Sequence, residues 1–318
     1  IYIAQMDKED NIWEPKNWVK CCPLGGRDPE LVSQMQDDAK KAKSMGGDEL
    51  RDFMTKSLNI WVTNAETAFI DLTEWEKCGC KKTLEDFRGK KAICGLDLSS
   101  GGDLTSLALE FPYEDERTGD RKYYIYSYSF IPKQRMQEHM DQEDNAPYVI
   151  WQQEGLLTVT TAAAGIKTDY KTILAHLHTL VDVYEIDLTA IAYDPHNASA
   201  FLLDLEDFGC DLVEIKQSAR SLNDATIDFQ LEVKAHNMEY DERNKLLTRS
   251  MNDAILSQPN SFGEIKIDKM LQKNRIDPCD AVICSHKVAM CVEIDEITTD
   301  QSVEEYLKMF EKGAGNSE

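Results

Sequence analysis

The stretch AICGLDLSSGGDLTSLALEF, residues 92–111, places an aspartate, Asp97, inside what otherwise reads as a buried β-strand. Two short apolar runs flank a Ser-Ser-Gly-Gly-Asp cluster, and this composition is typical of a turn, so the segment is predicted to form a β-hairpin. A carboxylate in a buried strand is costly unless something pairs with it. We therefore expect Asp97 to face a positively charged partner, and a metal ion is the candidate.

Length and composition predict a globular protein. The chain has 318 residues, of which 42% are hydrophobic, enough to form the core of one large domain or two small ones. No run approaches the roughly 18 apolar residues that a membrane span needs, and no signal sequence is present, so we expect no membrane partner. The chain begins IYIAQMDKED, without an initiator Met, and we expect it to be a piece of a longer polypeptide.

The charge balance restricts what the chain can bind on its own. It has 58 acidic and 35 basic residues, a formal net charge of −23, which argues against tight, non-specific binding to a polyanion. A nucleic-acid substrate would need help from metal ions, from a missing domain, or from the basic stretches at 77–82 and 88–91, which can equally be a solvated linker. The nine cysteines lack zinc-site spacing and predict reduced, buried thiols.

Three parts are expected along the chain: a helix-rich lead-in over 1–90, a main domain over 91–293, and a C-terminal helix with a disordered tail over 294–318. In the lead-in, one helix starts at Asp28-Pro29 and a second near Asp48. The main domain opens with three antiparallel strands and then alternates helices and strands; the predicted elements are strands 91–98, 104–111 and 123–131, helix 169–185, strand 188–194, helix 197–208, strand 211–216, helices 224–235 and 242–257, and a helix from Pro278. Three strands followed by αβαβα is the order of an RNase H-like mixed sheet.

Acidic residues end or begin several of these elements. Asp194, followed by a proline, ends the strand at 188–194, at the edge where α/β sheets collect ligands. Asp277 precedes Pro278 at a predicted helix start, and Asp280 follows one turn later on the same face. An aspartate there is also an ordinary helix N-cap, so this alternative stays open for Asp277.

An RNase H-like sheet places its first strand beside its fourth, with the last helix packed across both, so Asp97, Asp194 and Asp277 are expected to converge. Three unpaired carboxylates in a small space repel one another. Two divalent cations, about 3.5–4 Å apart, would neutralise them and form a site that cleaves phosphodiesters. Oxygen ligands favour Mg²⁺ or Mn²⁺ over zinc. We therefore predict Asp97, Asp194 and Asp277 as catalytic and metal-binding residues, with Asp280 as a further metal ligand.

Supporting roles are predicted for residues near these acids. Asp103 either orients a ligand or finishes the hairpin turn, and His196 either bonds a scissile phosphate or a metal-bound water or is a surface histidine. Lys269, Lys273 and Arg275 lead into the last helix and are candidate phosphate contacts, because cleavage without base readout relies on the DNA backbone. Solvated charge is the alternative for these three.

An ordered set of motifs resembles the C-terminal nuclease domain of the large terminase subunit of tailed bacteriophages, over roughly residues 13–290. In chain order the motifs are SLNIWV, GLDLSSGGDLTSLAL, WQQEGLLTVT with GIKTDY, YDP and RIDPCDAV. The resemblance implies a metal-dependent endonuclease that cuts concatemeric double-stranded DNA during genome packaging in the host cytoplasm, with the terminase small subunit and the portal protein as partners. Asp97 and Asp194 match the metal-binding acids of the family. The third is either Asp277 or Asp280, and we favour Asp277 because of its Ile-Asp-Pro context.

The sequence departs from the family in two places. No G-x-x-x-x-G-K-[ST] phosphate loop is present, so we expect the ATPase domain to be missing and this chain to hydrolyse no ATP. TAAAGIKTDY carries three alanines where a Thr-x-Gly step is expected, and Asp169 there is predicted to be a helix cap. Two rival functions remain: a catalytically silent docking module of the packaging motor, and a sugar-kinase or actin-like phosphotransferase, whose duplicated unit does not occur here.

We predict weak intrinsic binding to duplex DNA with a steep salt dependence, because few local Lys and Arg contacts can oppose a net charge of −23. Fluorescence anisotropy of a labelled duplex, measured without divalent metal at several salt concentrations, checks this. Tight binding that is insensitive to salt would contradict it.

Overall fold

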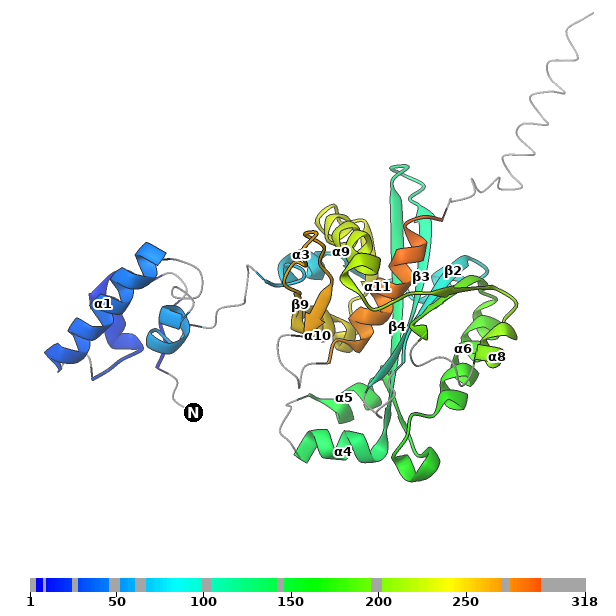
Figure 1. Cartoon of the computed structure of the whole chain (residues 1–318), viewed down its shortest axis with the longest axis horizontal. Coiled ribbons are helices and arrows are strands. Elements are labelled where there is room, and N and C mark those ends of the chain that lie inside the picture. The colour runs from blue at the N-terminus through cyan, green and yellow to red at the C-terminus, as the bar shows by residue number, and fades with distance from the viewer. Residues whose placement is uncertain are drawn as a thin grey trace, which may run out of the picture. The chain divides into compact units, whose positions relative to one another are not determined.

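The computed structural model describes residues 4–7, 10–24, 28–45, 52–60, 67–98, 104–141, 146–195, 202–269 and 275–292. The chain divides into two compact units, Ile1–Asp71 and Leu72–Glu318 (Figure 1). We expected the main domain to start near residue 91, and the structure places its start earlier. The reason is the ring of Trp75, which is fully buried and stacks on Tyr240 with ring centroids 4.2 Å apart, so the segment that carries it belongs to the sheet unit.

The first unit is a small helical body. Its elements are η1 (Pro15–Lys20), α1 (Pro29–Met45) and η2 (Phe53–Ser57), a short π-helical segment. Asp28 starts α1 as predicted, because its Oδ1 accepts the backbone N–H of Glu30. Trp18 and Leu58 are buried in the core of this unit with Phe53. The predicted start of the second helix at Asp48 lies outside the described residues, as does the predicted tail.

The second unit contains the sheet and the helices that cover it. In chain order the elements are α3 (Leu72–Lys77), β1 (Gly79–Cys80), η3 (Leu84–Phe87), β2 (Lys91–Asp97), β3 (Thr105–Glu114), β4 (Arg121–Pro132), α4 (Lys133–Asp141), α5 (Tyr148–Gln153), β5 (Leu157–Thr160), η4 (Ala162–Gly165), α6 (Tyr170–Tyr184), β6 (Asp187–Tyr193), α8 (Leu202–Glu206), β7 (Asp211–Glu214), α9 (Ala219–Lys234), β8 (Met238–Asp241), α10 (Lys245–Asp253), β9 (Ala254–Leu256), β10 (Ile267–Lys269) and α11 (Asp277–Ala289). None of the described helices is long and apolar enough to cross a membrane.

The main sheet has the predicted mixed topology. Its strand order is β1-β8-β4-β3-β2-β6-β7, and β5 also pairs with β4. The pairs β2·β3 and β3·β4 are antiparallel, whereas β6 and β7 extend the sheet in parallel from β2. The predicted helix at 242–257 is shorter than expected: α10 is preceded by β8, which pairs with β4, and followed by β9, which forms a separate hairpin with β10.

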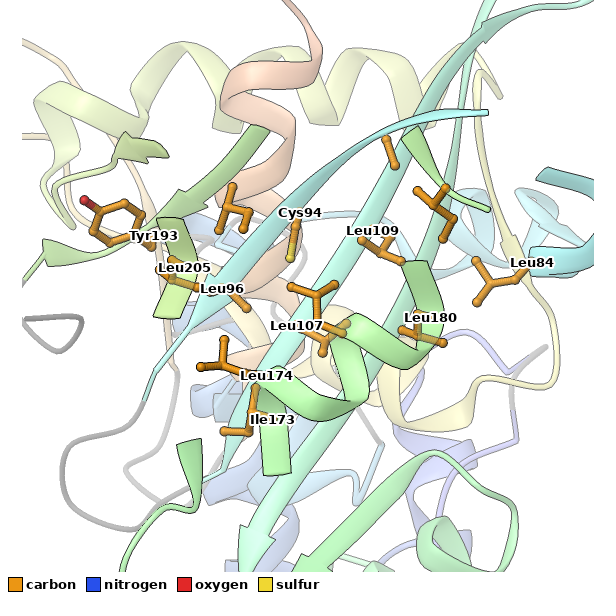
Figure 2. Close-up of a cluster of buried hydrophobic side chains, with 14 of the residues drawn as sticks. Leu84, Cys94, Leu96, Leu107, Leu109, Ile173, Leu174, Leu180, Tyr193 and Leu205 are labelled. Carbon is orange, nitrogen blue, oxygen red and sulfur yellow. The ribbon is translucent and has the colours of Figure 1, made fainter. Parts of the chain in front are cut away.

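Helices cover both faces of this sheet (Figure 1). On one face, Cys94 and Leu96 of β2 pack with Leu174 of α6 in a large apolar cluster (Figure 2). Asp169 caps α6 as predicted, because its Oδ1 accepts the backbone N–H of Thr172. Side chains alternate along a strand, so the residues between the apolar ones on β2 face the other side, where α11 lies.

Gly95 sets how closely α11 approaches β2. A methyl group at this position would overlap the carbonyl oxygen of Ala281 and lie 2.6 Å from the backbone nitrogen of Ser285. Only a glycine lets the helix backbone lie this close to the strand. Gly95 therefore fixes the distance between the strand that ends at Asp97 and the helix that begins at Asp277.

We predict that Gly95→Ala lowers the free energy of unfolding by about 1–3 kcal/mol, because the added methyl forces α11 away from β2. Urea denaturation measures this. Gly79→Ala is the graded control, since a methyl there would meet its nearest atoms at 3.1 Å and 3.2 Å, and we expect it to cost less. Equal losses in the two variants would contradict the special role of Gly95.

Candidate active site

The sheet register brings Asp97 and Asp194 together. The parallel pairing of β2 with β6 runs Gly95 to Ala192 and Leu96 to Tyr193, and the next residues are Asp97 and Asp194. Neighbouring strands lie about 4.8 Å apart. Because Leu96 and Tyr193 point into the apolar cluster on the α6 face (Figure 2), the two aspartates that follow them face α11.

Helix α11 adds two further acids on the same side. Asp277 is its first residue and Asp280 follows one turn later, while Ile276 is in the N-cap position. Ala281, which touches Gly95, is the next residue after Asp280. The close approach of α11 to β2 therefore holds both acids near the end of β2, and Asp277 is not the N-cap that we considered as its alternative role.

The charges of these acids act on one another. Burial raises the pKa of Asp97 well above its ordinary value. The negative charges of Asp280, Asp277 and Asp194 raise it further, in that order, and the ammonium of Lys269 opposes them. The sequence favours Asp277 over Asp280 as the third acid. In the structure the charges of both raise the pKa of Asp97, and that of Asp280 raises it more.

Asp280 shows the same effect. Burial and the negative charge of Asp277 raise its pKa to about 7, against the cations of Lys266 and Lys269. The single charges of the two lysines do not neutralise such a cluster. Its carboxyl groups therefore retain protons above the pH at which they would ionise in water. The cluster is therefore electrostatically suited to a cation.

The donor set fits a hard divalent cation. All four side chains offer carboxylate oxygens, the ligands that Mg²⁺ and Mn²⁺ prefer. Within the described residues, no three His, Cys, Asp or Glu side chains stand at distances that would hold an ion. Like charges repel one another, so side chains without a cation are expected to spread, and rotation of their χ angles would be needed to close the group around an ion.

The other residues singled out from the sequence have different outcomes. Asp103, His196 and Lys273 lie outside the described residues. Lys269 is exposed on β10 and its charge reaches Asp97, which is compatible with a phosphate contact.

Arg275 differs from our expectation of a phosphate contact. It is only 6% exposed, and its guanidinium donates to Tyr148 Oη at 3.1 Å and contacts His139 Nδ1 at 2.7 Å. The guanidinium thus faces the protein interior, where it ties the start of α11 to α4 and α5.

Two further residues near the acids were not predicted from the sequence. Lys266 precedes β10, and its ammonium acts on Asp280. Cys284 lies one turn after Asp280, is fully buried, and accepts a hydrogen bond from Gln217 Nε2 at 3.3 Å. Burial raises the pKa of Cys284, and Asp97 and Asp280 raise it further, so this thiol lies beneath the acids. Its spacing of four residues from Asp280 is the signal that could have identified it.

Comparison with known proteins identifies the family of this chain. The family model of the terminase large subunit endonuclease domain matches residues 1–293. This chain belongs to that family. Among relatives of this terminase domain, Protein YmfN of Escherichia coli (strain K12) is 27% identical over 312 residues, covering 96% of this chain and 66% of that protein. The large terminase subunit of Enterobacteria phage HK97 is 26% identical over 286 residues, covering 89% of this chain and 53% of that protein.

The fold comparison gives the same family. The crystal structure of the HK97 large terminase matches with a TM-score of 0.59 and 25% identity, covering 90% of this chain and 56% of that chain. The terminase domain described here thus has the RNase H-like fold expected from its sequence. It spans about half to two thirds of the length of these relatives.

The raised pKa values predict how the metal-free protein responds to pH. An acid whose pKa is raised by folding stabilises the fold below its unfolded pKa of about 4, and this stabilisation is lost as the pH rises through the folded pKa, about 7 for Asp280. We predict that the free energy of unfolding in EDTA falls between pH 5 and pH 8, and falls less in Asp280→Asn. Urea denaturation at both pH values measures the two slopes.

Asp211→Asn is the matched control, because Asp211 is exposed at the far end of β7. It should keep the parent's pH slope. An Asp280→Asn variant with the same slope as the parent would show that Asp280 does not carry the effect.

Proposed function

We propose that this chain is the metal-dependent endonuclease part of a terminase large subunit, which cuts concatemeric double-stranded phage DNA during genome packaging. The observation that carries the proposal is the placement of Asp97 and Asp194 at the ends of two adjacent parallel strands, with Asp277 and Asp280 of α11 facing them. Membership of the terminase endonuclease-domain family supports the reaction class.

The proposed roles follow from where each side chain lies. Asp97 and Asp194 extend from the sheet and would hold the centre from one side, and Asp277 and Asp280 would hold it from the helix side. Two Mg²⁺ or Mn²⁺ ions bound there would supply an activated water and stabilise the leaving oxygen of the phosphodiester. Lys269 offers an exposed ammonium beside the acids that can attract a DNA phosphate without reading the base.

Double-stranded DNA must reach this site despite the net charge of −23. We propose that the rest of the packaging machinery holds the DNA: an ATPase domain outside this chain, the terminase small subunit and the portal protein, in the host cytoplasm. The chain itself contains no phosphate loop, and we assign it no ATP hydrolysis.

A catalytically silent docking module is the second candidate. It is favoured by one observation, that no three potential ligands in the described part of the chain stand at ion-holding distances. The two candidates differ in their response to Mn²⁺, because a docking module has no reason to bind ions between Asp97 and Asp194.

Asp194→Asn provides the test. We predict that it reduces plasmid nicking in Mn²⁺ or Mg²⁺ by on the order of 100-fold or more, because an amide is a poor ligand for hard cations. The stabilisation that Mn²⁺ gives in a thermal melt should shrink, since it follows the dissociation constant of the ion. Without metal, stability should be unchanged or higher by about 1 kcal/mol, because one like charge is removed.

Asp211→Asn again serves as the control and should cut at the parent's rate. An Asp194→Asn variant that nicks DNA as fast as the parent would rule out the proposed nuclease centre. A variant that melts well below the parent in EDTA would assign Asp194 a structural role. A parent that shows neither nicking nor a Mn²⁺ shift would favour the docking module.

A further inference from the structure

Beyond the acids, α11 carries a second polar group, which is completely buried. The imidazole of His286 has no exposed surface, and neither has Glu110 of β3. His286 Nδ1 lies 2.7 Å from Glu110 Oε1, and His286 Nε2 lies 3.0 Å from Asp228 Oδ2 on α9. Ser285 Oγ donates to the other oxygen of Glu110 at 2.8 Å. We refer to Glu110, Ser285, His286 and Asp228 as the Glu110–His286 cluster.

The contacts define the protonation of the ring. Each ring nitrogen faces a carboxylate, and a carboxylate oxygen accepts, so both nitrogens must donate and the imidazole must be an imidazolium. Burial by itself lowers the pKa of His286, but the charge of Glu110 and the hydrogen bonds to Asp228 and Glu110 outweigh it and raise the pKa to about 9. The hydrogen bond from His286 in turn lowers the pKa of Asp228.

Apolar side chains also hold α11 in place. The buried residues of the helix include Val282 and Ile283, and apolar packing is non-directional. Gly95 sets how near the helix lies to β2, but the absence of a side chain there does not by itself fix the helix along its axis or in rotation. Charge-assisted hydrogen bonds have defined lengths and angles. Hydrogen bonds of Arg275 to Tyr148 and of the Cys279 backbone N–H to Ser250 Oγ restrain the start of α11. The Glu110–His286 cluster supplies the charge-assisted, directional restraint further along the helix.

We propose that His286, held between Glu110 and Asp228, is a positioning residue that fixes the axial and rotational setting of α11. His286 follows Asp280 by six residues, about 9 Å along a rigid helix, so the setting of the ring determines where Asp277 and Asp280 stand relative to Asp97. The inference rests on the proposed function, because it concerns how the acids of that site are held.

Arg121 and Tyr123, both on β4, also lie beside the cluster. Arg121 of β4 lies over the ring of Tyr123, donates to the carbonyl of Ala289 at 2.6 Å, and helps to lower the pKa of Asp228. Tyr123 meets His286 edge-on, with ring centroids 5.2 Å apart. The carboxylates of Glu110 and Asp228 are thus balanced by two cations, the imidazolium of His286 and the guanidinium of Arg121. Removing one of these partners leaves an uncompensated buried charge.

The experiment measures the Mn²⁺ dissociation constant by calorimetry at pH 7.5 on protein whose fold is checked by circular dichroism. We expect His286→Gln to raise this constant about 10- to 100-fold, as loss of a residue that orients ligands does elsewhere. His236→Asn is the control. His236 also contacts a carboxylate, Glu74 Oε2 at 2.7 Å, but lies outside α11, and Asn tolerates its positive φ of 58°. We expect no change in that variant.

Glu110→Gln carries the test if His286→Gln does not fold. It keeps the shape of the side chain and an acceptor for His286 Nδ1, but it removes one of the charges that keep the ring protonated. Its Mn²⁺ dissociation constant should increase as the pH rises from 7 to 8, while that of the parent, whose His286 keeps its proton over this range, does not. A purely structural role would lower the melting temperature and leave the Mn²⁺ affinity of the folded molecules unchanged, which would overturn the inference.

Hydrogen exchange of α11 in EDTA separates failure of the inference from failure of the proposed function. Faster exchange over residues 277–285 is expected in Glu110→Gln and not in His236→Asn. A parent that binds no Mn²⁺ would refute the proposed function, and faster exchange would still support the positioning role. If the parent binds Mn²⁺, and His286→Gln and Glu110→Gln bind it equally tightly, the positioning role is refuted and the proposed function is not.

Discussion

The close approach of α11 to β2 at Gly95 is the constraint on which the rest of the site depends. A side chain larger than hydrogen would collide with the carbonyl oxygen of Ala281, so helix and strand are in backbone contact. This contact sets the distance between the acids of α11 and Asp97. The buried imidazolium of His286 sets the position of the helix along its axis and its rotation about it. Neither Gly95 nor His286 is one of the four acids, yet both restrain where the four carboxylates stand.

The sheet separates two environments within a few residues of one strand. Cys94 and Leu96 stabilise the fold by packing against α6, and Asp97 faces the opposite side, among like charges. The protein therefore tolerates an unfavourable electrostatic cluster because the same strand is anchored by apolar packing. The raised pKa values of Asp97 and Asp280 follow from this conflict.

Much of this arrangement was accessible from the sequence. An apolar run of strand length beside a turn cluster placed Asp97 in a strand, and the Asp-Pro step placed Asp194 at a strand end. The order of strands and helices along the chain predicted the fold. What could not be predicted depends on contacts between distant segments. Nothing local distinguishes Arg275, which faces Tyr148 and His139, from an exposed phosphate contact. The strand β8 was missed because MEYD is short and sits between two helical patterns.

The branching of the sheet at β4 has a consequence for behaviour in solution. β4 pairs with β8 at Tyr123–Ile125 and with β5 at Ser129–Pro132, and between them the side-chain amide of Asn244 donates to the carbonyl of Ser127 at 2.9 Å. The outer strands β1, β5 and β7 have only two, four and four residues. Short edge strands offer few unpaired backbone groups to another chain. A long central strand is thus shielded by brief neighbours, which protects the described sheet against edge-to-edge aggregation when many copies are crowded together.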